Sequence, residues 1–119
     1  MNGIELIAQE RQRQIEAEGW TPEHDDEHDA GQLAAAARCY TKTAQLQVCR
    51  LVSRQLGRPE FTWPWDDEAW KPSPDAIRNL VKAGALIAAE IDRLQRTKHK
   101  RVWTGPGYLE QTGYIDPQG

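Results

Sequence analysis

Apolar residues recur at spacings of three and four in three separate stretches of this chain, and that period predicts amphipathic α-helices. The stretches cover about 2–18, 30–56 and 74–96. The middle helix is either unbroken or interrupted near 41–43. The pattern therefore predicts an all-α fold, a compact bundle of about three to four helices.

Short signals mark the ends of these helices. Gly19 follows the first as a C-terminal stop, and Gly57 with Pro59 closes the second in the same way. The sequence Ser73-Pro74-Asp75 places a cap residue, a first-turn proline and a first-turn acid in the order typical of a helix start. We expect the third helix to begin there.

The third helix has the most regular apolar stripe of the three. Its middle holds the small residues 83–85, which allow another backbone to approach closely. A core of this size cannot hide all five tryptophans, and helices paired between subunits would bury more apolar surface. We therefore expect a homo-oligomer, a dimer or tetramer. The stripe consists of Ile77, Leu80, Val81, Gly84, Ile87, Ala88, Ile91 and Leu94.

The remaining segments are irregular by composition. Segment 20–29 has a Thr-Pro step and a high density of charge, and segment 59–72 contains three prolines and three tryptophans. Residues 98–119 have glycines and prolines without a period. We predict a helical domain over 1–97 with a Trp/Pro-rich loop, followed by a C-terminal tail.

Composition narrows the class of protein. The 119 residues suffice for one domain, and 39% hydrophobic with 28% charged residues is ordinary for a folded globule. A net charge of −3 with intermixed signs offers no basic surface for duplex nucleic acid. No apolar run suits a signal peptide or a membrane span, which favours the cytoplasm. Cys39 and Cys49 are then expected to be reduced thiols and not a metal or redox pair, because no CxxC spacing accompanies them.

The densest cluster of charge is the segment 23–29, with five carboxylates and two imidazoles. Carboxylates this close repel one another unless a cation offsets them, and oxygen ligands suit Mg²⁺ or Mn²⁺. The alternative is a solvated loop whose acids pair with Arg11 or Arg13 and whose last acid, Asp29, caps the next helix. The predicted Mg²⁺ ligands are Glu10, Asp25, Asp26 and Asp29.

A second candidate site is the sequence Trp63-Pro64-Trp65-Asp66, with Lys71 close behind it. Indoles braced by proline can stack on a nucleobase, and a lysine can meet a phosphate. The alternative is that these indoles fill a helical core otherwise rich in alanine. Lys82 is a third candidate, because it lies beside the small residues 83–85, where a charge needs a partner.

Residues 10–28, 31–40, 63–66, 70–73 and 80–94 carry a resemblance to a widespread family of small phage and prophage proteins, most of them uncharacterised. The motifs WTPEHDD, WPWD and LVKAGALIAAEIDRL are the most recognisable parts. The resemblance implies a phage-associated origin, and hence the cytoplasm of a bacterial host cell, more firmly than it implies an activity.

At a greater distance, the helical layout with an acidic cluster is similar to MazG-like all-α nucleoside triphosphate pyrophosphohydrolases. Those enzymes bind Mg²⁺ through an ExxE pair on one helix and an ExxD pair on another. In this chain Arg13 follows Glu10 where the second acid would stand. Asn79 and Lys82 occupy the place of the other acidic pair.

Three functions fit these features. The first is a Mg²⁺-dependent nucleotide pyrophosphohydrolase, in which the acids hold metal against the phosphates and orient a water. The second is a non-catalytic phage protein with an anti-defence role, which sequesters a nucleotide immune signal such as a cyclic nucleotide. The third is a structural or regulatory interaction. The residues expected to contact a nucleotide are Arg11, Gln14, Trp20, His24, Trp63, Trp65 and Lys82.

Overall fold

Four α-helices make up the described part of the chain, residues 1–49 and 63–100 of a computed structural model, and no strand occurs there. The predicted all-α bundle of three to four helices is confirmed. In none of these helices is there a stretch of apolar sequence sufficient for a membrane span. The elements in chain order are α1 (Gly3–Glu18), α2 (Pro22–Asp25), α3 (Gln32–Val48), a 3-10 turn (Asp67–Ala69) and α4 (Ala76–Lys100).

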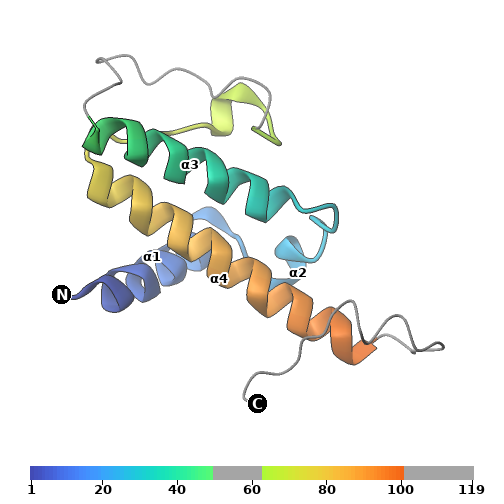
Figure 1. The fold of residues 1–119 in the computed structure, drawn as a ribbon. Helices are drawn as coiled ribbons and strands as arrows, with labels where there is room; N and C mark the ends of the chain where they lie inside the picture. Colours follow the sequence, from blue (N-terminus) through green and yellow to red (C-terminus); the bar gives the residue numbers. More distant parts are fainter. Residues whose placement is uncertain (50–62, 101–119) are drawn as a thin grey trace, which may run out of the picture.

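The two long helices α3 and α4 lie side by side and run in opposite directions, and α1 crosses behind α4 in Figure 1. Gly84 marks this crossing, because a Cβ atom at that position would collide with the side chain of Ile7. The close approach expected at residues 83–85 is therefore made by α1 of the same chain. It does not by itself indicate a second subunit.

The core lies between α3, α4 and the segment that starts at Trp63. Alanines on the facing sides of α3 and α4 let the two helices approach, and aromatic rings close the end of the layer. Trp63 is buried among them, so core filling, the alternative weighed for these indoles, is confirmed for this one. The core cluster consists of Leu33, Ala36, Ala37, Cys39, Tyr40, Trp63, Trp70, Ala83, Leu86 and Ala89.

The apolar stripe of α4 does not face this core. Five of its large side chains are between 46% and 63% exposed. The buried face of α4 combines Val81 and Leu86 with alanines and with the polar residues Asn79 and Arg93. The periodicity predicted the helix correctly. Which of its faces is buried depends on how closely α3 packs against the alanines of α4. The exposed members of the stripe are Ile77, Leu80, Ile87, Ile91 and Leu94.

Local hydrogen bonds explain where the helices begin and end. Asn2 caps α1 in a reciprocal pair with Glu5, and Gly19 ends the helix in the left-handed conformation (φ 75°), as predicted. At α4 the predicted cap, Ser73, is wrong by two residues. The side chain of Asp75 accepts from the N–H of Ile77 at 3.0 Å, while Ser73 accepts from the N–H of Asp75.

The predicted loop 20–29 contains a turn of helix, α2. Thr21 caps it by accepting from the N–H of His24, and Pro22 occupies the first helical position. The next helix, α3, is capped by Gly31 and not by Asp29, which is exposed two residues earlier. The capping role weighed for Asp29 is therefore wrong.

The helix α3 is continuous through residues 41–43, where an interruption was one alternative. The hydroxyl of Thr41 donates to the carbonyl of Ala37 at 2.9 Å, so this polar side chain is satisfied within the helix. The predicted continuation from residue 50 to 56 lies outside the described residues, as does the tail after Lys100. The helix α4 continues to Lys100, past the predicted domain boundary at residue 97.

Candidate functional site

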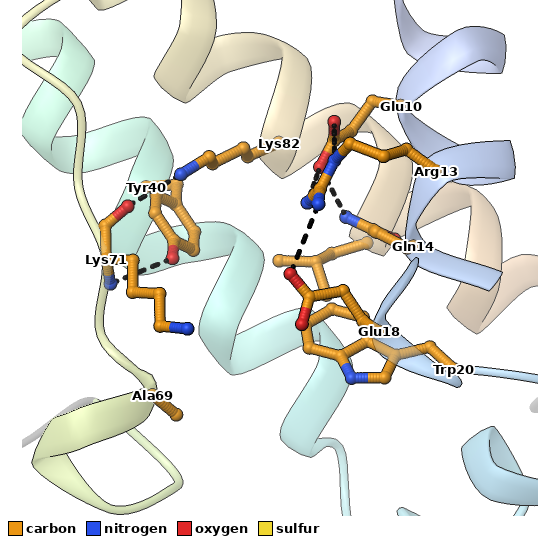
Figure 2. Close-up of a pocket in the computed structure, with 10 residues that line it drawn as sticks. Glu10, Arg13, Gln14, Glu18, Trp20, Tyr40, Ala69, Lys71 and Lys82 are labelled. Carbon is orange, nitrogen blue, oxygen red and sulfur yellow. Dashed lines mark hydrogen bonds and ion pairs between the residues drawn. The ribbon is translucent and has the colours of Figure 1, made fainter. Parts of the chain in front are cut away.

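A pocket of about 230 Å³ opens between α1, α3, α4 and the segment after the 3-10 turn (Figure 2). Side chains from elements far apart in the sequence meet there. The region of α1 and the residues after it contribute Glu10, Arg13, Gln14, Glu18 and Trp20. The other elements contribute Tyr40, Ala69, Lys71, Lys82 and Leu86.

Glu10 anchors the α1 side of the pocket. Its carboxylate is 1% exposed and accepts two hydrogen bonds from Arg13, both at 2.9 Å. The Nη2 atom of Arg78 in α4 lies 2.6 Å from its Oε1 atom. Burial opposes ionisation, but the hydrogen bonds from Arg13 and Arg78 outweigh it and lower the pKa of Glu10. The carboxylate is therefore ionised and already occupied by two guanidinium groups.

Gln14 is buried next to Glu10 in the pocket wall. Its amide nitrogen donates to the Glu10 carboxylate at 3.3 Å. This contact fixes the orientation of the amide, because the opposite orientation would set two oxygens against each other. The Oε1 atom of Gln14 then has no hydrogen-bond partner within the described residues.

Tyr40, Lys71 and Lys82 form the opposite side of the pocket (Figure 2). The Lys82 ammonium donates to the carbonyl of Lys71 at 2.6 Å and lies 5.5 Å from the centre of the Tyr40 ring. The hydroxyl of Tyr40 accepts from the N–H of Lys71 at 3.3 Å. The backbone of Lys71 thus positions both side chains.

Burial and charge act on the ionisable groups here. Burial, with Arg78 as the next cause, lowers the pKa of Lys82 below its ordinary value. Burial also raises the pKa of Tyr40, so its hydroxyl keeps its proton at neutral pH. Burial is the largest cause of both pKa shifts, because it removes a charged form from water. An anion bound in the pocket would change both pKa values.

The charges of the pocket do not balance among themselves. Arg13 is engaged by both lining carboxylates, since it bonds Glu10 and lies 3.2 Å from Glu18. No carboxylate of the described residues forms an ion pair with Lys71 or Lys82. Two ammonium groups, one of them half-buried, therefore face the pocket without an anionic partner in residues 1–49 and 63–97.

Trp20 supplies an indole on the α1 side. Its ring lies parallel to the imidazole of His24, with centroids 6.2 Å apart, and contacts Trp65 at the same centroid distance. Of these three, only Trp20 lines the pocket. Trp63 does not line it either, because its indole is buried and donates to the carbonyl of Asp66 at 2.9 Å.

Arg11, predicted to contact the nucleotide, is tied to α2 instead. Its guanidinium lies 2.6 Å from the Asp25 carboxylate and donates to the carbonyl of Trp20 at 3.2 Å. The ion pair is well shielded, with 13% and 0% of the two side chains exposed. The pairing of this loop with Arg11, one alternative weighed from the sequence, is confirmed. Arg11 holds Trp20 in place but does not reach the pocket.

The acids predicted to bind Mg²⁺ do not meet. Glu10 and Asp25 are paired with arginines, as described above. Asp26 lies 2.7 Å from Arg96, and Asp29 is exposed. Across residues 1–49 and 63–100 no three His, Cys, Asp or Glu side chains are placed to hold a metal ion together. The four acids therefore do not fit a shared Mg²⁺, because arginines already neutralise three of them.

The pocket unites three of the seven predicted contact residues, Gln14, Trp20 and Lys82, with Glu10 from the metal prediction. It adds Arg13, Glu18 and Tyr40, which were not predicted as contacts from the sequence. Tyr40 lies in the helix predicted over about 30–56, where its spacing indicates only an apolar stripe. Its hydroxyl was the available signal, because a phenol on a buried face needs a polar partner.

No family model, curated protein or solved structure matches the chain. The resemblance to small phage proteins and to MazG-like enzymes therefore stays a prediction. The function is inferred from the pocket.

Proposed function

We propose that this protein binds a nucleotide in the pocket between α1, α3 and α4, without hydrolysing it. The observation that carries the proposal is the half-buried Lys82 ammonium, which lacks a carboxylate partner among the described residues. An unpaired charge removed from water is costly unless an opposite charge offsets it. A phosphate group would provide that charge to Lys82 and to Lys71 beside it.

The aromatic side chains support a ligand with a flat ring. Trp20 and Tyr40 both line the pocket. Stacking of a base on an aromatic side chain contributes about 1–3 kcal/mol and tolerates different bases. A ligand that combines a ring with phosphate matches both halves of the pocket.

The state of the acids favours binding over metal-dependent hydrolysis. The two described acids of the pocket, Glu10 and Glu18, are both paired with Arg13. Among the described residues the pocket therefore has no free cluster of carboxylates to position Mg²⁺ and a water. The Mg²⁺-dependent pyrophosphohydrolase stays a prediction from the acidic sequence and from the resemblance. Binding without turnover suits a phage protein that sequesters a nucleotide immune signal, cyclic nucleotides included, in the host cytoplasm.

Calorimetric titration of the full chain with mono-, tri- and cyclic nucleotides tests the proposal. We expect binding in EDTA as well as in Mg²⁺, and intact nucleotide recovered when the complex is heated. Lys82→Met should weaken binding, whereas Lys42→Met, a matched change at an exposed lysine of α3, should not. Release of pyrophosphate in Mg²⁺ would assign the hydrolase instead, and no binding to any nucleotide would overturn both.

We also propose that the protein is a homo-oligomer that pairs through the exposed stripe of α4. Five large apolar side chains there are about half exposed, and Ile4 of α1 is 80% exposed. Monomers rarely leave a contiguous apolar patch of this kind in water. Sedimentation of the full chain at micromolar concentration tests this, and a mass of 13.5 kDa would count against it.

A further inference from the structure

The polar groups on the α3–α4 side of the pocket are all hydrogen-bond donors toward a ligand. Lys71 and Lys82 have ammonium groups, which only donate. The Tyr40 hydroxyl accepts from the backbone N–H of Lys71, and no acceptor for its own proton is found in the described residues. Its proton is therefore the part of the hydroxyl left for a ligand.

We infer that Tyr40, Lys71 and Lys82 form a phosphate subsite, in which the Tyr40 hydroxyl donates to a phosphate oxygen and the two lysines offset its charge. The inference rests on the proposed function and adds to it the orientation of the nucleotide. The phosphate lies against α3 and α4, and the base lies toward Trp20.

The subsite is positioned in advance by the backbone of Lys71. Its carbonyl holds the Lys82 ammonium at 2.6 Å and its N–H holds the Tyr40 hydroxyl at 3.3 Å. Tyr40 is only 6% exposed, so its hydroxyl has little freedom to turn to water. Donors fixed before binding lose less conformational entropy when the ligand arrives.

The α1 side of the pocket differs, because its one described cation, the Arg13 guanidinium, is already paired with Glu10 and Glu18. The Glu18 carboxylate faces the pocket there, and the buried Oε1 atom of Gln14 is an acceptor without a partner among the described residues. These oxygens would repel a phosphate but can accept from the N–H groups of a base. The contrast between the two sides permits one orientation of the ligand.

The size of the pocket limits what it encloses. Its volume of about 230 Å³ is below the roughly 300–1,000 Å³ typical of sites that enclose drug-sized ligands. A nucleoside triphosphate would therefore extend beyond it into solvent. We expect the phosphate bonded directly to the nucleoside to be the one that reaches Tyr40.

The test compares the 5′-monophosphates of the four bases with the corresponding nucleosides, by calorimetry on the full chain. Tyr40→Phe should weaken monophosphate binding about tenfold, because a hydrogen bond to a charged group is lost. Nucleoside binding should stay unchanged. Equal losses for both ligands, or no loss for either, would overturn the subsite while leaving the proposed function intact. If neither nucleosides nor nucleotides bind, the proposed function itself fails.

A second measurement tests whether Lys71 and Lys82 lie against the phosphate. The phosphorus resonance of the bound monophosphate should titrate with a pKa below that of the free ligand, since Lys71 and Lys82 favour the dianion. Lys82→Met should move this pKa back toward the free value, and Lys42→Met should leave it in place. A bound phosphate that titrates like the free ligand in the unaltered protein would contradict the subsite.

Discussion

The Oε1 atom of Glu10 lies 2.6 Å from the Nη2 atom of Arg78. The pair joins α1 to α4 in the wall of the pocket, with Glu10 1% exposed and Arg78 37% exposed. Because Arg13 bonds the same carboxylate, one acid pairs with two guanidinium groups. Glu10 therefore supports the fold and the pocket together.

Glu10→Gln should lower the free energy of unfolding by about 2 kcal/mol at pH 7, less than for a fully buried pair because both arginines are partly exposed. The pKa of Glu10 is lowered from 4.5, so its contribution is complete above that value and is lost as the pH falls through the lowered pKa. Denaturant titrations at pH 7 and at pH 3 measure this. The difference between the variant and the unaltered protein should shrink at pH 3, and Glu16→Gln, at an exposed acid of α1, should show no difference at either pH.

Millimolar Mg²⁺ should leave the melting temperature unchanged, since arginines already occupy Glu10, Asp25 and Asp26. Asp25→Asn should cost about 3 kcal/mol, because it leaves the shielded Arg11 without its partner. Asp26→Asn, at a more exposed pair, should cost less than about 1 kcal/mol. Thermal melts of the unaltered protein, Asp25→Asn and Asp26→Asn, with and without Mg²⁺, measure both effects. A rise with Mg²⁺ that disappears in Asp26→Asn would restore the metal site.

Nucleotide affinity should decrease as the pH rises through the lowered pKa of Lys82, that is, before the ordinary 10.5 is reached. The ammonium form binds phosphate, and burial makes that form easier to lose in the empty pocket. Binding at alkaline pH should therefore take up protons. Calorimetry in two buffers of different ionisation enthalpy measures the uptake. Lys82→Met should remove the pH dependence, and its persistence there would assign the effect to another group.

The two tryptophans Trp20 and Trp63 should differ in what their removal affects. Trp20→Ala should weaken nucleotide binding about tenfold through lost stacking. Trp63→Ala should cost about 4 kcal/mol of stability, because this indole is buried and hydrogen-bonded to Asp66. Calorimetry and thermal melts on both variants test the contrast. If Trp63→Ala weakened nucleotide binding and Trp20→Ala did not, the ligand would lie against the Trp63-Pro64-Trp65 segment, as predicted from the sequence.

Ile91→Glu should convert an oligomer to a monomer while changing the stability of each chain little, since this side chain is 51% exposed. Gln45→Glu adds the same charge at an exposed position of α3 and should leave the assembly intact. Sedimentation velocity of the three proteins at equal concentration measures the effect. Identical sedimentation of all three would remove the stripe as an interface.

The helices could be predicted from the sequence because periodicity, caps and glycine stops are local. The buried face of α4 could not, since Ile87 and Ile91 look more suited to a core than Ala83 or Ala89. Tertiary packing reversed that ranking: Ala83 and Ala89 let α3 approach, Leu86 is buried beside them, and Ile87 and Ile91 are left about half exposed.

The site could be predicted only in part, because tertiary contacts decide which side chains meet in the pocket. Lys82 was found because a lysine beside small residues needs a partner, whereas Trp20 was selected without a local pattern of its own. The pairing of Arg11 with Asp25 was one of several alternatives. Tyr40 joins the site through a backbone N–H more than thirty positions away, a contact to which no local pattern points.

Four indoles form a continuous series that begins with Trp20 in the pocket, so the tryptophan fluorescence of the protein should depend on whether the pocket is occupied. The ring centroids of Trp20 and Trp65 are 6.2 Å apart. Those of Trp65 and Trp63 are 5.4 Å apart, and those of Trp63 and Trp70 are 4.9 Å apart. Indoles this close exchange excitation energy faster than they emit it. A base stacked on Trp20 would therefore quench the ultraviolet fluorescence of all four, so occupancy can be followed without any added dye.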